Sequence, residues 1–374
     1  EAFNTKGPAL MGRQSAGEGF LRGYLRHAKT DSFHFWNVAD RPVAELDAFV
    51  QAIGAVDLPP RGPAGSDGAP GPTGPMGPPG PAGADAVTAP HDRRTIVLDV
   101  FTAEPLKGNP LAVVVDADGL SDAQMAAYAR WTNLSETTFL LPPTDPQADY
   151  RVRIFTPGGE LPFAGHPTLG SCQAWLDAGG VPRQAGVVVQ ECGVGLVRVR
   201  QVDGGSNRLA FAAPPLRRSG PAEPEVVAQV LRALRLSADA VLQVEWIDNG
   251  PGWLGVRLHD AAAVRALVPD YVAMRGLNVG VVGAWPAGGA VDVEVRAFVP
   301  DLGVPEDPVT GSLNAGLAQW LIGTGQLPAR YVAGQGHALG RDGRVHVEHI
   351  AEGDRAGVWI AGDVTRCIAG TLRL

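Results

Sequence analysis

The feature that most constrains the fold is a segment that occurs twice in the chain. The ten residues RIFTPGGELP, beginning at Arg153, align with RAFVPDLGVP, beginning at Arg296, and four of the ten positions are identical. With a gap of two residues, Gly170 then aligns with Gly311, and an alanine-rich stretch that carries Trp-Leu follows each of them. The chain is therefore expected to contain the same strand, turn and helix twice.

A duplicated unit buries its apolar faces best against its own copy, so the two turns are expected to face each other across a cleft between two lobes. Such clefts are the usual ligand sites of enzymes. Each turn also delivers a helix N-terminus, whose unsatisfied N–H groups and dipole favour an anion. In a single turn, Gly, Ser and Pro would be ordinary turn and cap chemistry. Their recurrence at matching places favours a carboxylate-binding site.

The flanking residues predict a mixed α and β fold with mostly antiparallel strands. Apolar patterns of strand type occur at 94–102, 111–116, 136–141, 150–156 and 291–299. Ser121 is a typical N-cap for a helix that runs through Trp131. Helices are expected at 166–178 and 312–323, each after a glycine-bearing turn.

The N-terminal quarter has a different amino-acid composition. From Gly62 to Asp85, glycine occupies every third position in a proline-rich, collagen-like pattern of eight triplets. We expect residues 59–93 to form an extended spacer, since two of the triplets lack proline; a trimerising triple helix is the alternative. Residues 1–58 have no assigned function, and helical runs are expected near 19–28 and 43–53.

Composition narrows the class of partner. The net charge of -8 offers no basic face for nucleic acid or an anionic membrane, so a small-molecule partner is expected. No stretch reaches the roughly 20 apolar residues that span a bilayer. The three cysteines are widely separated and form no CxxC pair, which favours a reducing cytoplasm over a disulfide framework.

Two groups of polar residues stand in the repeated turns. His166 lies in PFAGHPT of the first copy, where its ring could relay a proton or bind an anion. Asp307 and Ser312 lie in EDPVTGS of the second copy, where a structural role would be to begin the turn and cap the helix. The alignment sets Asp307 opposite Ala164. An imidazole and a carboxylate are therefore expected to face each other across the cleft.

Glu136 is the third candidate, because it directly precedes the apolar run 137–141. Partial burial at the cleft rim would raise its pKa towards neutrality, which suits a group that must both take and return a proton. A solvated strand-edge glutamate is the plain alternative. The chain has no GxxxxGK[ST], GxSxG or HExxH motif.

Several motifs, in this order, resemble the PhzF family of phenazine-biosynthesis isomerases, which shares the fold of diaminopimelate epimerase. They are GNP at 108–110, SETTF at 135–139, FTP at 155–157, LPFAGHPT at 161–168 and EDPVTGS at 306–312. The resemblance covers residues 94–374. It implies an α+β fold of two pseudo-symmetric lobes, each a curved, mostly antiparallel sheet around a central helix. The lobes would comprise 94–213 and 214–363, with the strand 364–374 returning to the first.

The resemblance also implies a reaction and roles. Glu136 would be the acid/base that moves a ring proton of a carboxylate-bearing substrate such as trans-2,3-dihydro-3-hydroxyanthranilate, without metal or cofactor. His166, Asp307 and Ser312 would assist as catalytic residues. Substrate binding would involve Asn109, Gly165, Thr168 and Gly311, the two glycines through backbone N–H groups. Family members are commonly homodimers, so a homodimer is expected.

The sequence departs from the related two-cysteine epimerases. In place of the facing thiols, the alignment puts Ala164 and Asp307, and Cys172 is expected to pack inside a helix. Two alternatives stay open: an epimerase or racemase of an amino-acid derivative, which needs a second acid/base facing Glu136, and a non-catalytic collagen-like trimeric scaffold.

Overall fold

The structure is a computed structural model that describes residues 10–14, 20–27, 32–37, 91–202, 207–302, 304–353 and 356–374. The chain divides into two units, Glu1–Gly83 and Ala84–Leu374. In the first unit, β1 (Leu10–Gln14), β2 (Phe20–His27) and β3 (Ser32–Asn37) form an antiparallel sheet. The helix expected near 19–28 is therefore wrong. Aromatic residues at Phe20 and Tyr24 favour a strand, and pairing on both sides outweighs the weak helical pattern.

Other N-terminal predictions fall outside the described residues, namely the collagen-like tract 62–85 and the helix near 43–53. The spacer was expected to reach residue 93, but β4 already begins at Asp92. A shift of this size is usual where a boundary is read from sequence alone.

The second unit begins with ten elements. They are β4 (Asp92–Val100), β5 (Asn109–Val114), α2 (Asp122–Thr132), β6 (Thr137–Leu141), β7 (Tyr150–Thr156), β8 (Gly159–Leu161), α3 (Gly165–Asp177), β9 (Val187–Cys192), β10 (Gly195–Gln201) and β11 (Arg208–Ala212). Ser121 caps α2 with a capping box that includes Gln124, as expected from its place in the sequence.

The remaining elements complete this unit. They are β12 (Arg218–Pro221), α4 (Pro224–Leu234), β13 (Val241–Asp248), β14 (Trp253–Leu258), α5 (Ala261–Arg265), β15 (Asn278–Ala284), β16 (Val293–Phe298), β17 (Glu306–Asp307), α6 (Gly311–Gly323), β18 (Arg330–Gln335), β19 (Gly343–Ile350) and β20 (Gly357–Arg373), with short 3-10 turns at Ala238–Ala240, Pro300–Leu302 and His337–Leu339.

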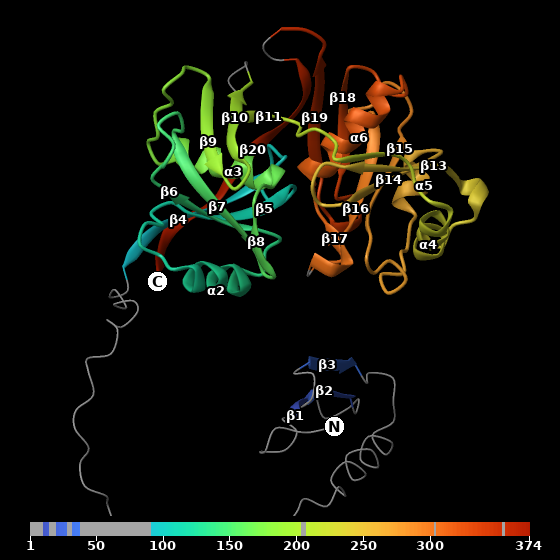
Figure 1. The fold of residues 1–374 in the computed structure, drawn as a ribbon, viewed down its shortest axis with the longest axis horizontal. Helices are drawn as coiled ribbons and strands as arrows, with labels where there is room; N and C mark the ends of the chain where they lie inside the picture. The colour runs from blue at the N-terminus through green and yellow to red at the C-terminus, as the bar shows by residue number, and fades with distance from the viewer. Residues whose placement is uncertain are drawn as a thin grey trace, which may run out of the picture. The chain divides into compact units, whose positions relative to one another are not determined.

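The two halves repeat one pattern of strand pairing, which confirms the internal repeat. In the first half, β5 pairs with β6 in parallel, β6 pairs with β7 antiparallel, and β7 pairs with β8 antiparallel. In the second half, β14, β15, β16 and β17 pair in the same order and with the same directions. A second parallel pair then joins β7 to β9, or β16 to β18. Figure 1 shows the two resulting lobes side by side, each with one helix, α3 or α6, inside its curved sheet.

The central position of these helices follows from their sequences. Every residue from Gly165 to Ala174 of α3 is buried, and α6 is buried on most of its surface. A helix without a charged face suits the middle of a sheet-lined core. Gly170 fits closely against Leu111, and Gly316 fits against Ile247.

The structure corrects the register of the repeat. The N-terminal residues of the central helices are Gly165 and Gly311, so Gly311 is equivalent to Gly165 rather than to Gly170. The second copy contains three more residues before its helix, in the segment that forms the turn Pro300–Leu302. Thr310, and not Asp307, is therefore equivalent to Ala164.

The strand β20 ties the lobes together. Its beginning pairs with β19 of the second lobe, and its residues Val364–Arg373 pair with β4 of the first. It also pairs with β11, so the strands close into one barrel-like sheet. Among the described residues, no helix has the length and apolar character needed to cross a bilayer.

Candidate active site

The tips of the two central helices touch at the junction between the lobes. A Cβ added to Gly165 would lie 3.0 Å from the Cα of Gly311, so only glycine allows this approach. The N-cap residues Ala164 and Thr310 make no side-chain cap hydrogen bond. Both helices therefore present uncapped N–H groups towards one region of the molecule.

Glu136 stands in the short link between α2 and β6. Asn133 ends α2 in the left-handed conformation, and the hydroxyls of Thr132 and Thr137 lie 2.8 Å apart, which closes the link. The Glu136 side chain is only 15% exposed. Burial raises the pKa of Glu136 to about 8, and the Asp307 carboxylate adds to the rise, while a hydrogen bond from Ser135 opposes it. The carboxyl group thus exchanges its proton near neutral pH.

His166 faces Glu136, with 3.4 Å between Nε2 and Oε2. Burial lowers the pKa of His166 to about 3, so the ring is neutral and the contact is not an ion pair. The amide nitrogen of Asn109 lies 3.2 Å from Nδ1. An amide nitrogen cannot accept a hydrogen bond, which disfavours a proton on Nδ1, so the ring proton is assigned to Nε2, the nitrogen nearer to Glu136.

Asn109 joins the two lobes at this point. Its Nδ2 donates to Oδ1 of Asp307 at 2.8 Å and to the carbonyl of Val309 at 2.9 Å. These partners only accept, so the orientation of the amide is fixed. The Thr310 hydroxyl donates to the other Asp307 oxygen at 2.6 Å. Burial raises the pKa of Asp307 to about 6, although both hydrogen bonds favour its ionised form.

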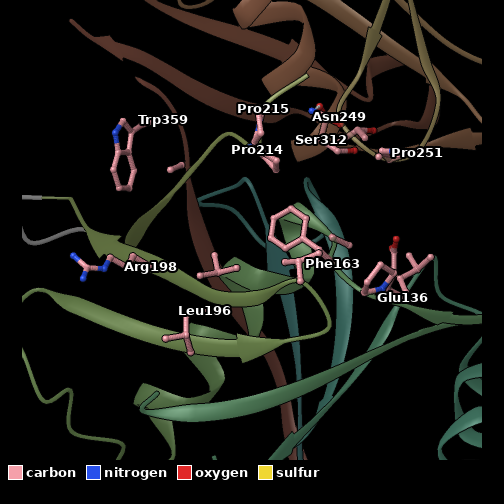
Figure 2. Close-up of a pocket in the computed structure, with 18 of the residues that line it drawn as sticks. Glu136, Phe163, Leu196, Arg198, Pro214, Pro215, Asn249, Pro251, Ser312 and Trp359 are labelled. Carbon is pink, nitrogen blue, oxygen red and sulfur yellow. Dashed lines mark hydrogen bonds between the residues drawn. The ribbon is translucent and has the colours of Figure 1, made fainter. Parts of the chain in front are cut away.

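A cavity of about 1370 Å³ opens beside this cluster, and Glu136, Asp307 and Ser312 are among its lining residues. In Figure 2, Ser312 and Asn249 lie across the cavity from Glu136, whereas Leu196, Arg198 and Trp359 lie at the far end, beyond Phe163. The indole N–H of Trp253 donates to Oγ of Ser312 at 3.0 Å. The Asn249 amide donates to the Ser312 carbonyl at 2.8 Å. The Ser312 hydroxyl proton therefore remains available for a ligand.

The structure brings together Asn109, Glu136, His166 and Asp307 through the contacts above, and places Ser312 on the same cavity. Asn109 and His166 stand behind the wall, since both are buried and absent from its lining. Thr168 is fully buried, and its hydroxyl donates to the Ala164 carbonyl at 2.9 Å. Its hydroxyl is thus engaged within the helix, and its expected contact with substrate stays a prediction.

Sequence reasoning missed several supporting residues. Gln335 is fully buried, donates to Oγ1 of Thr310 and accepts from its N–H. Thr310 could have been found, because it lies within the EDPVTGS motif. Asn249 and Trp253 lie in the turn DNGPGW, about sixty residues before Ser312, and no local pattern connects them to it.

The three cysteines stand apart from the site. Cys172 is buried in α3, where burial raises the pKa of its thiol, and none of the three cysteines lines the cavity. Within the described ranges, no three His, Cys, Asp or Glu side chains are grouped so that they could hold a metal ion.

Comparisons with known proteins agree with this architecture. Residues 98–370 match the family model described as phenazine biosynthesis-like protein. The chain belongs to the phenazine biosynthesis-like family. One curated relative is trans-2,3-dihydro-3-hydroxyanthranilate isomerase of Pseudomonas aeruginosa, 36% identical over 70% of this chain and 92% of its own length. Another is antisense-enhancing sequence 1 of Schizosaccharomyces pombe, 37% identical over 73% of this chain and 96% of its own.

The phenazine biosynthesis-like chain also matches a protein named as an isomerase and a solved structure. An uncharacterized isomerase of Escherichia coli O157:H7 is 33% identical over 67% of this chain and 88% of its own. The crystal structure of a phenazine biosynthesis protein from Enterococcus faecalis matches 76% of this chain and 100% of its own, with 27% identity and a TM-score of 0.62. The chain is therefore an enzyme of the isomerase class.

Proposed function

We propose that the enzyme catalyses a cofactor-independent proton transfer on a small carboxylate-bearing substrate such as trans-2,3-dihydro-3-hydroxyanthranilate. The observation that carries this proposal is Glu136, a mostly buried carboxyl group on the cavity wall with its pKa raised to about 8. A general acid/base works best when its pKa lies near the operating pH. A relative that bears the name of this isomerase supports the substrate class.

The geometry supports a simple sequence of steps. The ionised Glu136 takes a proton from one ring carbon, and the electron pair left behind moves through the conjugated system of the substrate. The protonated Glu136 then returns the same proton to another carbon, so that the net change is an isomerisation. The neutral ring of His166 lies beside Glu136, with 3.4 Å between Nε2 and Oε2, and would donate to the ionised carboxylate after a small side-chain adjustment.

The polar groups opposite Glu136 suit substrate binding. The N-cap residues Ala164 and Thr310 line the cavity, so the uncapped N-termini of α3 and α6 would bind the substrate carboxylate through backbone N–H groups. Gly165 and Gly311, whose N–H groups were expected to take part, are buried directly behind these two residues and are not among the lining residues. The hydroxyl of Ser312 would donate to a substrate oxygen, and Asp307 would accept from a hydroxyl or amino group.

Direct assay tests this function. The purified enzyme, incubated with trans-2,3-dihydro-3-hydroxyanthranilate and followed by NMR, should convert it without added metal or cofactor. Loss of substrate only on addition of a metal or an organic cofactor would contradict the proposal. Complete inactivity would exclude this substrate.

An amino-acid epimerase is the second candidate, because Asp307 is another carboxylate on the same cavity. However, both Asp307 oxygens already accept hydrogen bonds, from Asn109 and Thr310, which leaves Asp307 poorly placed to exchange a proton. Deuterium incorporation at the α-carbon of candidate amino acids in D₂O would favour the epimerase. The convergence of Glu136, His166 and Asp307 weighs against a purely structural scaffold.

A further inference from the structure

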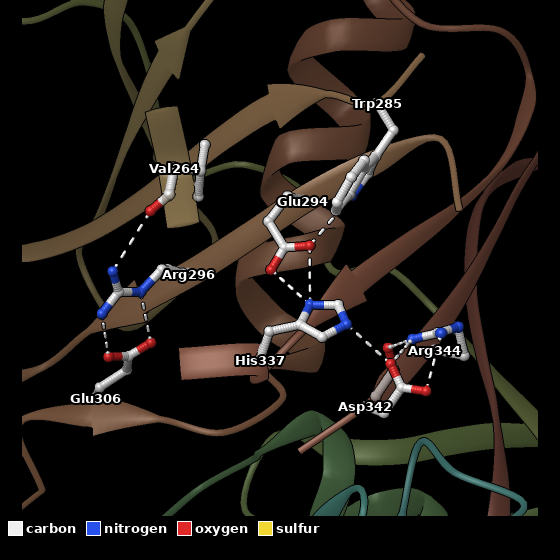
Figure 3. A network of polar contacts seen from close by, with 9 residues as sticks. Val264, Trp285, Glu294, Arg296, Glu306, His337, Asp342 and Arg344 are labelled. Atoms are coloured by element: carbon white, nitrogen blue, oxygen red, sulfur yellow. Dashed lines mark hydrogen bonds and ion pairs between the residues drawn. The ribbon is translucent and has the colours of Figure 1, made fainter. Parts of the chain in front are cut away.

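A second polar cluster, formed by Glu294, His337 and Asp342, lies outside the catalytic site (Figure 3). Glu294 on β16 is fully buried, and its carboxylate oxygens lie 2.7 and 2.9 Å from Nδ1 of His337. The other ring nitrogen, Nε2, lies 2.9 Å from Oδ1 of Asp342. Because ionised carboxylates only accept hydrogen bonds, both ring nitrogens must carry a proton. His337 is therefore an imidazolium between two carboxylates.

Positively charged and polar donor groups surround the two carboxylates that contact the His337 ring. Asp342 also receives two hydrogen bonds from the Arg344 guanidinium, at 2.7 and 3.0 Å. The indole N–H of Trp285 donates to Glu294 at 3.2 Å, and Arg265 lies over the Trp285 ring. The hydrogen bond to Glu294 is the largest cause of a raised pKa of His337, and the contact with Asp342 acts in the same direction.

The segment 336–344, called here the interlobe strap, connects this cluster to the first lobe. The backbone N–H of Asp342 donates to the carbonyl of Lys107 at 2.7 Å, and that of Arg344 donates to the carbonyl of Phe101 at 2.8 Å. The Arg341 side chain donates to the carbonyl of Leu106 at 3.2 Å. The strap therefore binds three carbonyls of the loop 101–108.

That loop leads directly into the catalytic site, since Asn109 follows it and contacts both His166 and Asp307. Phe101 and Leu106 each have a φ of 68°, in the left-handed region that residues other than glycine rarely adopt. Such conformations persist where surrounding contacts enforce them. On its other side, the strap packs against the turn after Asp307, because Gly343 fits closely against Val309.

We propose that the charged His337 is a positioning residue, which fastens the interlobe strap to the loop 101–108 and so keeps Asn109 in register with His166 and Asp307. The proposal rests on the proposed function, because the positioned residues belong to that site. A neutral ring has one N–H for two carboxylates, so one of the two contacts is lost when His337 deprotonates. Because the pKa of His337 is raised in the folded state, both carboxylate contacts are complete below the ordinary histidine pKa. One of them is lost as pH rises through the folded-state pKa.

Three variants separate this role from general packing. His337→Gln removes the charge, and His337→Lys keeps a cation to much higher pH. His349→Gln is the control, since His349 is an exposed histidine on β19, the strand into which the strap leads. At pH 6.5, His337→Gln should lower the melting temperature by about 5 °C and kcat by about tenfold with little change in KM. Backbone amides of 101–109 should exchange faster with D₂O. His337→Lys should restore most of these losses, and the control should match the wild type.

The pH dependence is decisive. The melting-temperature gap between wild type and His337→Gln should shrink as pH rises through the folded pKa of His337, whereas the gap between His337→Lys and His337→Gln should persist at pH 9. A gap independent of pH, or unchanged exchange in 101–109, would overturn the proposal. Melting and exchange require no substrate, so a wrong substrate assignment would leave these results valid. Normal exchange beside a lost turnover would overturn the positioning role while leaving the proposed function intact.

Discussion

Replacing Gly165 with alanine should force the tips of the two central helices apart. The new Cβ would lie 2.9 Å from Cζ of Phe211 and 3.0 Å from Cα of Gly311. Carbon atoms in contact prefer separations of about 3.5–4.0 Å, so the neighbours must move by about 0.5–1 Å. Phe211 is fully buried and has little room to yield. Overpacking of this kind lowers the free energy of unfolding by about 1–3 kcal/mol.

The same displacement should reduce turnover, because Glu136 and His166 belong to one lobe and Asp307 and Ser312 to the other. A misplacement of about 1 Å can cost on the order of 100-fold in rate. Urea unfolding and steady-state kinetics would measure both effects.

Gly323→Ala is the matched control for this substitution. Gly323 ends α6, and a Cβ there meets nothing within 4 Å. The control should be neutral, since alanine favours a helix more than glycine does. If Gly165→Ala kept wild-type stability and turnover, the close contact of the helix tips would be needed neither for the fold nor for the geometry of the site, and the reasoning would be refuted.

Three further predictions concern charge and thiol chemistry. Log kcat/KM should rise with pH and level off near the pKa of Glu136, about 8, because the reaction begins with the ionised form; a profile flat from pH 6 to 9 would contradict this. Arg296→Leu should lower the free energy of unfolding by about 3–5 kcal/mol, because it leaves the buried Glu306 without its ion pair (Figure 3). Arg153→Leu, at the equivalent but partly exposed pair, should cost about 1 kcal/mol or less, and equal losses on urea unfolding would refute the comparison. Replacing the three cysteines with alanine should leave kcat near the wild-type value, and abolished turnover in a folded variant would revive a thiol mechanism.

Much of the catalytic unit could be predicted from local patterns. The strand 150–156 alternates in sequence, and its burial alternates over most of its length. Ser121 signals the start of α2, and glycine-bearing turns signal α3 and α6. The convergence of Glu136, His166 and Asp307 followed from the repeat together with the family motifs.

The register of the repeat could not be read correctly, because Pro162 aligns with Pro305 by sequence identity although its structural equivalent is Pro308. The additional residues lie in the turn Pro300–Leu302, and a loop insertion leaves no periodic signal. In the corrected register, His166 and Ser312 occupy the same second position of their helices. Glu160 and Glu306 are also equivalent, and each pairs with the arginine of its copy, Arg153 or Arg296.

Contacts between distant segments also lay beyond sequence reasoning. The hydrogen bond from Trp253 to Ser312 and the strap that carries His337 depend on how the lobes pack. No composition or spacing in the chain indicates either of them.

The central claim is that Glu136 carries the transferred proton, and the Glu136→Gln variant tests it most directly. The amide keeps the shape of the side chain but cannot exchange a proton in the same way, so kcat should fall by about 100-fold or more while the fold is retained. Turnover of trans-2,3-dihydro-3-hydroxyanthranilate would be followed by NMR beside a thermal melt of the same sample. The account predicts a folded variant with almost no product, and a folded variant that turns over at near the wild-type rate would contradict it.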